Sequence, residues 1–139
     1  MANASLNTIS FEEFNKGIVD MLGTEDIPIN TSVYIVSDDT VTAIPASTST
    51  AVTGKRLGWT TRPYDHSEDE VVPVQTKYNR RVHRTVATGA TVSAGDDVKH
   101  DLTLPGTIRP WVWGDDEAIK IGIALVGAVP AGTAEIAEE

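Results

Sequence analysis

Three histidines are the side chains of this 139-residue chain best suited to metal binding or to proton transfer near neutral pH. His66, His83 and His100 each stand in a different local setting, and none forms a metal pair at His-x-His or His-x-x-x-His spacing. His66 lies in the acidic segment 64–70, which could contribute to a cation site but lacks the ligand spacing of an EF-hand. We interpret that segment as a solvated acidic loop, and we predict no metal site.

Other acidic and hydroxyl side chains give no catalytic pattern. Asp96-Asp97 and Asp115-Asp116-Glu117 are typical of turns, where carboxylates accept hydrogen bonds from nearby amides. The chain has no Gly-x-Ser-x-Gly elbow, no Gly-rich loop followed by Lys-Ser or Lys-Thr, and no His-Glu-x-x-His. A nucleophile and its base can also be assembled by the fold, so a small hydrolase stays open as a third interpretation. We predict a protein that binds rather than an enzyme, without catalytic residues or a cofactor.

Basic residues are concentrated in one segment of the chain. Four of the eleven Lys and Arg residues fall within residues 77–84, and strand-like alternation over residues 74–87 places Lys77, Arg81 and His83 on one face, opposite Val82 and Val86. On an acidic protein this face either sets the register of a partner or is solvated and balanced by the acidic loop. The three tryptophans are either core or interface residues, and Trp111 and Trp113 are expected on the same face of one strand. The candidate partner-binding residues are Lys77, Arg80, Arg81, His83, Arg84, Trp59, Trp111 and Trp113.

Composition limits the class of protein. The length suits one domain, and 40% hydrophobic with 22% charged residues is a globular composition. The absence of cysteine excludes disulfides and thiolate metal sites. A net charge of −9 opposes a nucleic-acid partner, and the longest apolar stretch, residues 119–130, is too short to span a membrane. Residues 1–8 lack the features of a secretory signal, so we expect the chain to be used where it is made.

One helix is predicted, near the N-terminus. Residues 10–13 have the capping-box form, apolar residues recur at three- and four-residue spacing from Phe11 to Leu22, and Gly23 follows as a C-terminal stop. Residues 1–9 before it are expected to form a flexible arm.

The rest of the chain has the pattern of short strands. A hairpin is predicted from residues 33–36 and 41–44, followed by a mobile Ser/Thr-rich loop over residues 46–53. Glycines separate the later strands, and no tandem repeat or linker is evident. We therefore predict a single mainly β domain over residues 1–139, a β-sandwich or β-barrel with one short N-terminal helix. Its further strands are expected at residues 56–61, 74–87, 91–92, 98–104, 108–113, 118–126 and 133–136.

Two stretches resemble phage head decoration proteins, the small β-rich cement proteins of icosahedral capsids. Residues 87–98, ATGATVSAGDDV, are similar to a V-x-A-G-D-x-V turn, and residues 121–136, IGIALVGAVPAGTAEI, are similar to a closing hairpin of that family. The N-terminal half carries no part of this resemblance, and no individual contact residue can be transferred from it.

The resemblance implies a structural virion protein without enzymatic activity or cofactor. Such a protein would be made in the host cytoplasm, bind the major capsid protein on the outer capsid surface, and stabilise the head against internal pressure. It would form a homo-oligomer, with a trimer as the expected state, and no contact with nucleic acid or membrane. The alternative is a β-barrel module that binds a ligand or carbohydrate on a phage tail or host surface; a concave pocket built from Trp59, Trp111 and Trp113 would favour it.

Overall fold

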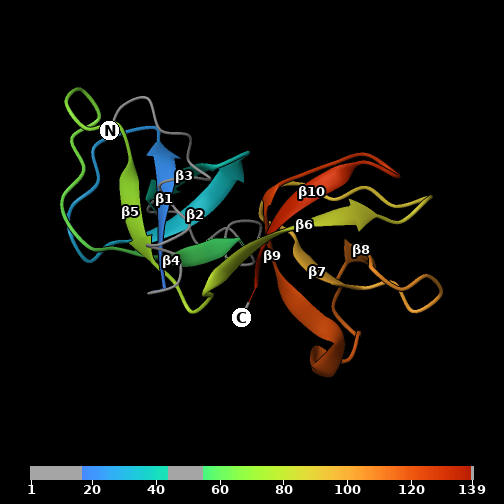
Figure 1. The fold of residues 1–139 in the computed structure, drawn as a ribbon. Coiled ribbons are helices and arrows are strands. Elements are labelled where there is room, and N and C mark those ends of the chain that lie inside the picture. The colour runs from blue at the N-terminus through green and yellow to red at the C-terminus, as the bar shows by residue number, and fades with distance from the viewer. Residues whose placement is uncertain (1–16, 44–54, 139) are drawn as a thin grey trace.

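The computed structural model describes residues 17–43 and 55–138, which form two five-stranded β-barrels lying side by side (Figure 1). The mainly β class is therefore confirmed, with barrels rather than a sandwich. The first barrel contains β1 (Ile18–Gly23), β2 (Ser32–Ser37), β3 (Thr40–Ala43), β4 (Arg56–Thr60) and β5 (Val72–Gln75). The second contains β6 (Arg80–Val86), β7 (Asp97–His100), β8 (Thr107–Pro110), β9 (Lys120–Val126) and β10 (Thr133–Glu138), with the 3-10 turn η1 (Glu117–Ile119) before β9.

The two barrels have the same topology. Their strand orders are β1-β3-β2-β4-β5 and β6-β8-β7-β9-β10, and in each barrel the first and third strands pair in parallel. The register irregularity between Val33 and Tyr34 in β2 recurs between Val98 and Lys99 in β7. The chain thus contains an internal structural repeat, although no tandem repeat is evident in its sequence.

One glycine in each barrel shows how closely the repeat is kept. Gly58 pairs with Val33 and Gly122 with Val98, so the two glycines occupy equivalent positions next to the irregularity. A Cβ at Gly58 would overlap the carbonyl oxygen of Gln75, and one at Gly122 would overlap that of Ala137. Only glycine therefore allows the neighbouring strands to approach this closely in either barrel.

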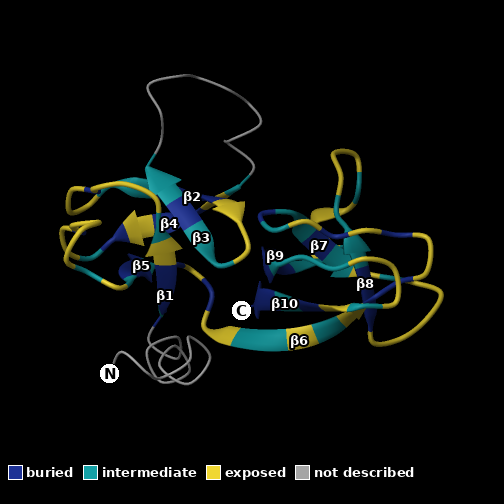
Figure 2. Cartoon of the chain, turned by 90° about the horizontal axis from the view of Figure 1, so that it is seen from above, coloured by how far each residue is buried: buried dark blue, intermediate teal, exposed yellow. Residues whose placement is uncertain are grey.

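The barrels share part of their hydrophobic core. Each interior is filled by its own apolar side chains, such as Val19 and Val41 in the first barrel and Val98 in the second. On the outer face of β9, however, Ile123 and Leu125 belong to the core cluster of the first barrel. Figure 2 shows this buried junction between the barrels. Burial of apolar surface across the junction stabilises the pair of barrels as one unit.

The N-terminal helix is not found in the described residues. Residues 18–23, which were expected to end that helix, form strand β1, and the remainder of the predicted helix and the arm of residues 1–9 lie outside the described residues. Val19 and Met21 are completely buried in the first barrel, so the pattern that decides this segment has period two rather than 3.6. The predicted loop of residues 46–53 also lies outside the described residues.

The predicted β2–β3 hairpin is confirmed, with Asp38 and Asp39 at its turn and Asp39 at a φ of 53°. The strand predicted over residues 74–87 is interrupted. It ends at Gln75 as β5 and restarts at Arg80 as β6, because residues 76–79 carry the chain from one barrel to the other. No helix in the described part of the chain is long and apolar enough to cross a membrane.

Candidate partner-binding groove

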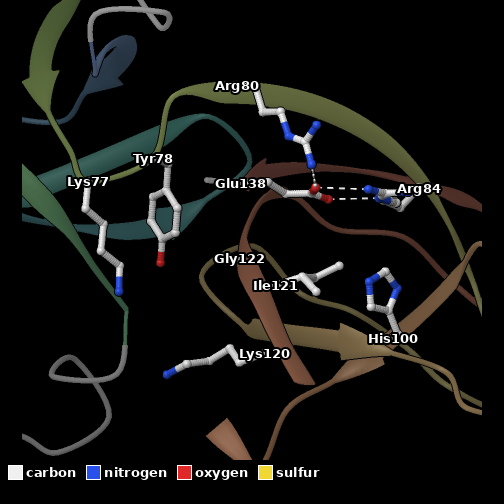
Figure 3. A pocket seen from close by; sticks show the side chains of 9 residues that line it. All are labelled: Lys77, Tyr78, Arg80, Arg84, His100, Lys120, Ile121, Gly122 and Glu138. Atoms are coloured by element: carbon white, nitrogen blue, oxygen red, sulfur yellow. Dashed lines mark hydrogen bonds and ion pairs between the residues drawn. The ribbon is translucent and has the colours of Figure 1, made fainter. Parts of the chain in front are cut away.

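Two hollows meet at the connection between the barrels. We call the first the seam groove; it has a volume of about 290 Å³ and is lined by Arg56, Leu57, Gly58, Trp59, Lys77, Tyr78, Asp97 and Lys120. We call the second the barrel-2 pocket; it has a volume of about 310 Å³ and is lined by Lys77, Tyr78, Arg80, Arg84, His100, Lys120, Ile121, Gly122 and Glu138 (Figure 3). Lys77, Tyr78 and Lys120 line both hollows, which are therefore neighbours and together make a basic depression on an acidic protein.

Lys120 connects this depression to the tryptophan loop, residues 111–113. As the first residue of β9, Lys120 places its Nζ 4.4 Å from the centre of the Trp111 ring, a cation–π contact. The same Nζ lies 3.4 Å from Glu117 and 3.9 Å from Asp97. Burial raises the pKa of Asp97, and the positive charges of Lys120 and Lys77 act in the opposite direction. The carboxylate of Asp97 thus offsets part of the positive charge of the seam groove.

Hydrogen bonds hold the tryptophan loop beyond the end of β8. The indole Nε1 of Trp111 donates to the carbonyl oxygen of Asp116 at 3.1 Å, and Asp115 accepts from the Val112 amide at 2.9 Å and from Lys99 at 2.7 Å. These hydrogen bonds lower the pKa of Asp115, and the bond from Lys99 has the largest effect. The Trp113 ring packs edge-on against Trp111, with 5.8 Å between ring centres, and is 93% exposed. The loop therefore presents a large apolar side chain to solvent in a supported geometry.

The predicted placement of Trp111 and Trp113 on one strand is wrong. Strand β8 ends at Pro110, where the chain turns away from the sheet, so the alternation of a strand does not apply to the two residues. They meet each other through the conformation of the loop instead.

Arg80 and Arg84 of β6 converge on one buried carboxylate. Glu138, at the end of the neighbouring strand β10, has a side chain only 3% exposed and accepts from Arg84 Nε at 2.8 Å and Nη2 at 2.9 Å. Arg80 Nη2 donates to the same carboxylate at 3.1 Å. The hydrogen bonds with Glu138 raise the pKa of Arg84, so its guanidinium group is charged at any physiological pH. Figure 3 shows this cluster at one side of the barrel-2 pocket.

Arg81 and His83 lie on the opposite face of β6, away from the groove. The Arg81 side chain is 7% exposed; it donates to both oxygens of Asp39 in the first barrel, at 2.8 and 3.0 Å, and to Glu135 at 2.7 Å. His83 is exposed and lies 3.7 Å from Glu135. The prediction that Lys77 shares this face is therefore wrong, because Lys77 precedes β6. Arg81 and His83 do share one face of the strand, but Arg81 is buried in a contact between the barrels.

The structure gathers six of the eight candidate partner-binding residues. Lys77, Arg80 and Arg84 line the barrel-2 pocket, and Trp59 lines the seam groove. Trp111 contacts Lys120, and Trp113 packs against Trp111. The residues that sequence reasoning missed come from strands distant in the chain, and no local pattern marks them. They are Arg56, His100, Lys120 and Glu138.

The acidic turns behave as capping residues. Asp65 accepts from the amide and the hydroxyl of Ser67 at 3.0 and 2.7 Å, and Asp96 accepts from the Ser93 amide at 2.8 Å, next to Gly95 with a φ of 92°. These contacts confirm the prediction that Asp96 accepts from nearby amides at the turn. Across residues 17–43 and 55–138, no three His, Cys, Asp or Glu side chains are grouped so that they could hold a metal ion.

No protein-family model matches the chain, and no curated protein is significantly similar to it. The function is therefore inferred from the sequence motifs and from the geometry of the groove.

Proposed function

We propose that this chain is a structural assembly protein that binds the outer surface of a phage capsid and stabilises it, as a head decoration protein. The observation that carries the proposal is Trp113, almost fully exposed on a supported loop beside the basic seam groove. Tryptophan and arginine are the residues most enriched at interface hot spots, and they act best when their conformation is fixed before binding.

The two stretches that resemble decoration proteins support the proposal by their position. Residues 87–98 and 121–136 are separated in sequence but adjacent in the second barrel, where Asp97 pairs with Ile123 and the Gly95 amide donates to the Ala124 carbonyl at 2.8 Å. A family resemblance is expected to involve residues that form one packed unit rather than scattered surface segments.

The mechanism is binding to the major capsid protein by two kinds of contact. Trp113 and the neighbouring Val112 would bury apolar surface in a pocket of the capsid lattice. The cations of the seam groove would speed encounter with an acidic capsid surface and set the register of docking. Copies arranged as a symmetric homo-oligomer, with a trimer expected, would sum many modest contacts and resist the pressure of the packaged genome.

The carbohydrate- or ligand-binding alternative gains less support from the geometry. A concave pocket that contains all three tryptophans would favour this alternative. Trp59 lines the seam groove from the first barrel, whereas Trp113 projects into solvent from the loop after β8. Trp113 is therefore better placed to enter a pocket on a partner than to form the wall of one.

Co-sedimentation with undecorated heads of the phage that encodes the chain tests the proposal. Trp113→Ala should weaken binding by about 30-fold, since hot-spot truncation costs about 2 kcal/mol or more. Arg56→Glu should slow association and make binding less sensitive to salt. Matched controls are Leu102→Ala, an exposed apolar residue on another loop, and Arg62→Glu, an exposed arginine outside the groove.

All four variants should keep the wild-type melting temperature within the small range typical of exposed substitutions. If Trp113→Ala and Arg56→Glu both bind like their controls, the groove and its loop are not the docking surface. If the wild-type protein does not co-sediment with heads at all, the decoration function itself is refuted. Light scattering of the free and the bound protein tests the trimer, and a stable dimer would contradict it.

A further inference from the structure

The two barrels differ at one end, although their strands pair in the same register. Arg84 pairs with Ala134 in β10 as Met21 pairs with Val72 in β5, so Arg84 occupies the position of Met21. His100 pairs with Ile108 as Ile35 pairs with Val41, so His100 occupies the position of Ile35. By the same pairing Ala137 corresponds to Gln75, which places Glu138 where the first barrel has Thr76.

These replacements open the second barrel where the first is closed. Met21 and Ile35 are completely buried and fill that end of the first barrel. In the second barrel the equivalent Arg84 and His100 line the hollow of about 310 Å³ instead. Since the backbone pairing is shared, the hollow results from the choice of side chains, not from a different strand geometry.

Arg84 and Glu138 are costly for the stability of the fold. A buried carboxylate such as Glu138 must be desolvated, and exchanging a buried ion pair for apolar residues of similar volume is often neutral or stabilising. The first barrel shows that this fold accepts uncharged residues at the same positions, Met21 for Arg84 and Thr76 for Glu138. A charged pair at the mouth of a hollow is therefore better explained by binding than by stability.

The charge of the barrel-2 pocket specifies the chemistry of its ligand. Of the pocket's four basic side chains, Lys120 is paired with Glu117 and Asp97 outside the pocket. Lys77, Arg80 and Arg84 then face the single carboxylate of Glu138, which leaves a net charge of +2. Glu138 engages one Nη of Arg80 and the Nε and Nη2 of Arg84, which orients both guanidinium groups and leaves further N–H donors on each. Fixed guanidinium groups beside flexible ammonium groups are suited to a multivalent oxyanion.

We propose that the open end of the second barrel binds the phosphate group of a small phosphorylated compound. A phosphate dianion matches the net charge of the pocket, whereas a single carboxylate would leave half of it in place. The volume is at the lower limit of small-molecule sites and admits a phosphate with an organic part the size of a sugar. This site does not depend on the proposed capsid function, because Trp113 and Arg56 lie outside it.

Isothermal titration calorimetry with the full chain tests the site, with pyrophosphate, glucose 6-phosphate and gluconate, a sugar acid with one carboxylate, as separate probes. We expect saturable, one-to-one binding of the two phosphate-bearing probes and at least tenfold weaker binding of gluconate. Arg80→Gln should weaken phosphate binding about tenfold, since it removes one charge-assisted partner from the wall. Arg62→Gln changes the net charge equally at an exposed position outside the pocket and should bind like wild type.

His100→Ile provides a second variant, because it introduces the residue that fills the equivalent position of the first barrel. It should reduce the hollow and weaken phosphate binding about tenfold, while the melting temperature is kept or raised. The proposal is overturned by no saturable binding of either phosphate probe, by gluconate binding as tightly, or by equal losses in Arg80→Gln and Arg62→Gln. A capsid-binding result for Trp113→Ala has no bearing on these outcomes.

Discussion

Arg81 links the two barrels through its side chain, and its replacement by Met tests that role. The guanidinium donates three hydrogen bonds to two carboxylates, Asp39 in the first barrel and Glu135 in the second, each 18% exposed. Next to it the Asp39 amide donates to the Leu125 carbonyl at 2.9 Å. Met keeps most of the apolar stem of Arg81 and removes only the charge and its donors.

The expected loss of stability follows from the charges left behind. Breaking a buried ion pair costs about 3–5 kcal/mol, because the remaining partner is left uncompensated. Asp39 and Glu135 keep some access to water, so we expect about 2–4 kcal/mol for Arg81→Met, discounted for screening. For a chain of this size that loss corresponds to a decrease in melting temperature of roughly 8–16 °C.

The pH dependence of the loss has a definite sign. In the wild-type protein burial raises the pKa of Asp39 more than the charge of Arg81 lowers it. Without Arg81 the pKa of Asp39 in the folded state rises further above its value in the unfolded chain. The folded variant therefore binds a proton at Asp39 more tightly than the unfolded chain does. Acidification through the interval between these two values therefore favours the folded variant. The deficit of Arg81→Met should be largest at neutral pH and should shrink as the pH falls into the carboxyl range.

Urea denaturation of Arg81→Met and wild type at neutral and acidic pH measures both effects. The control is Arg62→Met, which removes the same charge from an exposed position and should change the unfolding free energy by no more than about 0.5 kcal/mol. A deficit below about 1 kcal/mol would mean that Arg81 does not hold the barrels together. A deficit that grows on acidification would refute the assignment of unpaired carboxylates as its cause.

Three further outcomes are expected. Gly122→Ala should destabilise the second barrel by about 1–3 kcal/mol in thermal melting, since its Cβ would overlap the Ala137 carbonyl; wild-type stability would contradict the close approach. Glu138→Thr should lower the free energy of unfolding by about 3 kcal/mol, because it leaves Arg84 without its carboxylate. Adding Arg84→Met should restore most of that loss, and a coupling energy near zero between the two substitutions would contradict the reasoning. Melting with and without a chelator should coincide, and a large loss on chelation would show that turn carboxylates such as Asp96 bind a metal.

The sequence predicted the secondary structure best where local chemistry decides it. The β2–β3 hairpin could be recognised because β-branched runs flank two aspartates, and the turn needs one of them, Asp39, at positive φ. The helix prediction is wrong for residues 18–22, because the alternation of Val19 and Met21, which are buried in the first barrel, matches the observed strand better than the helical spacing of Ile18 and Leu22. Tertiary pairing overrode a weak helical signal.

The repeat could not be seen in the sequence because it is kept in pairing rather than in residue identity. The distance between equivalent residues varies from 62 positions, for Gln75 and Ala137, to 67, for Val41 and Ile108, so no fixed period exists. The candidate groove was hidden for a related reason. Its walls come from strands of both barrels, and their proximity is a product of barrel closure and not of local spacing.

The shared topology also explains how one strand, β6, serves two purposes. Because side chains alternate along a strand, Arg80 and Arg84 point to the pocket side, while Arg81 points to the first barrel. In the first barrel the positions of Arg84 and Arg81 are held by Met21 and Ile18, neither of which carries a charge. The basic side chains of β6 are thus features of the second barrel alone. Exchanging Arg81 therefore tests the contact between the barrels, whereas exchanging Arg80 or Arg84 tests the barrel-2 pocket.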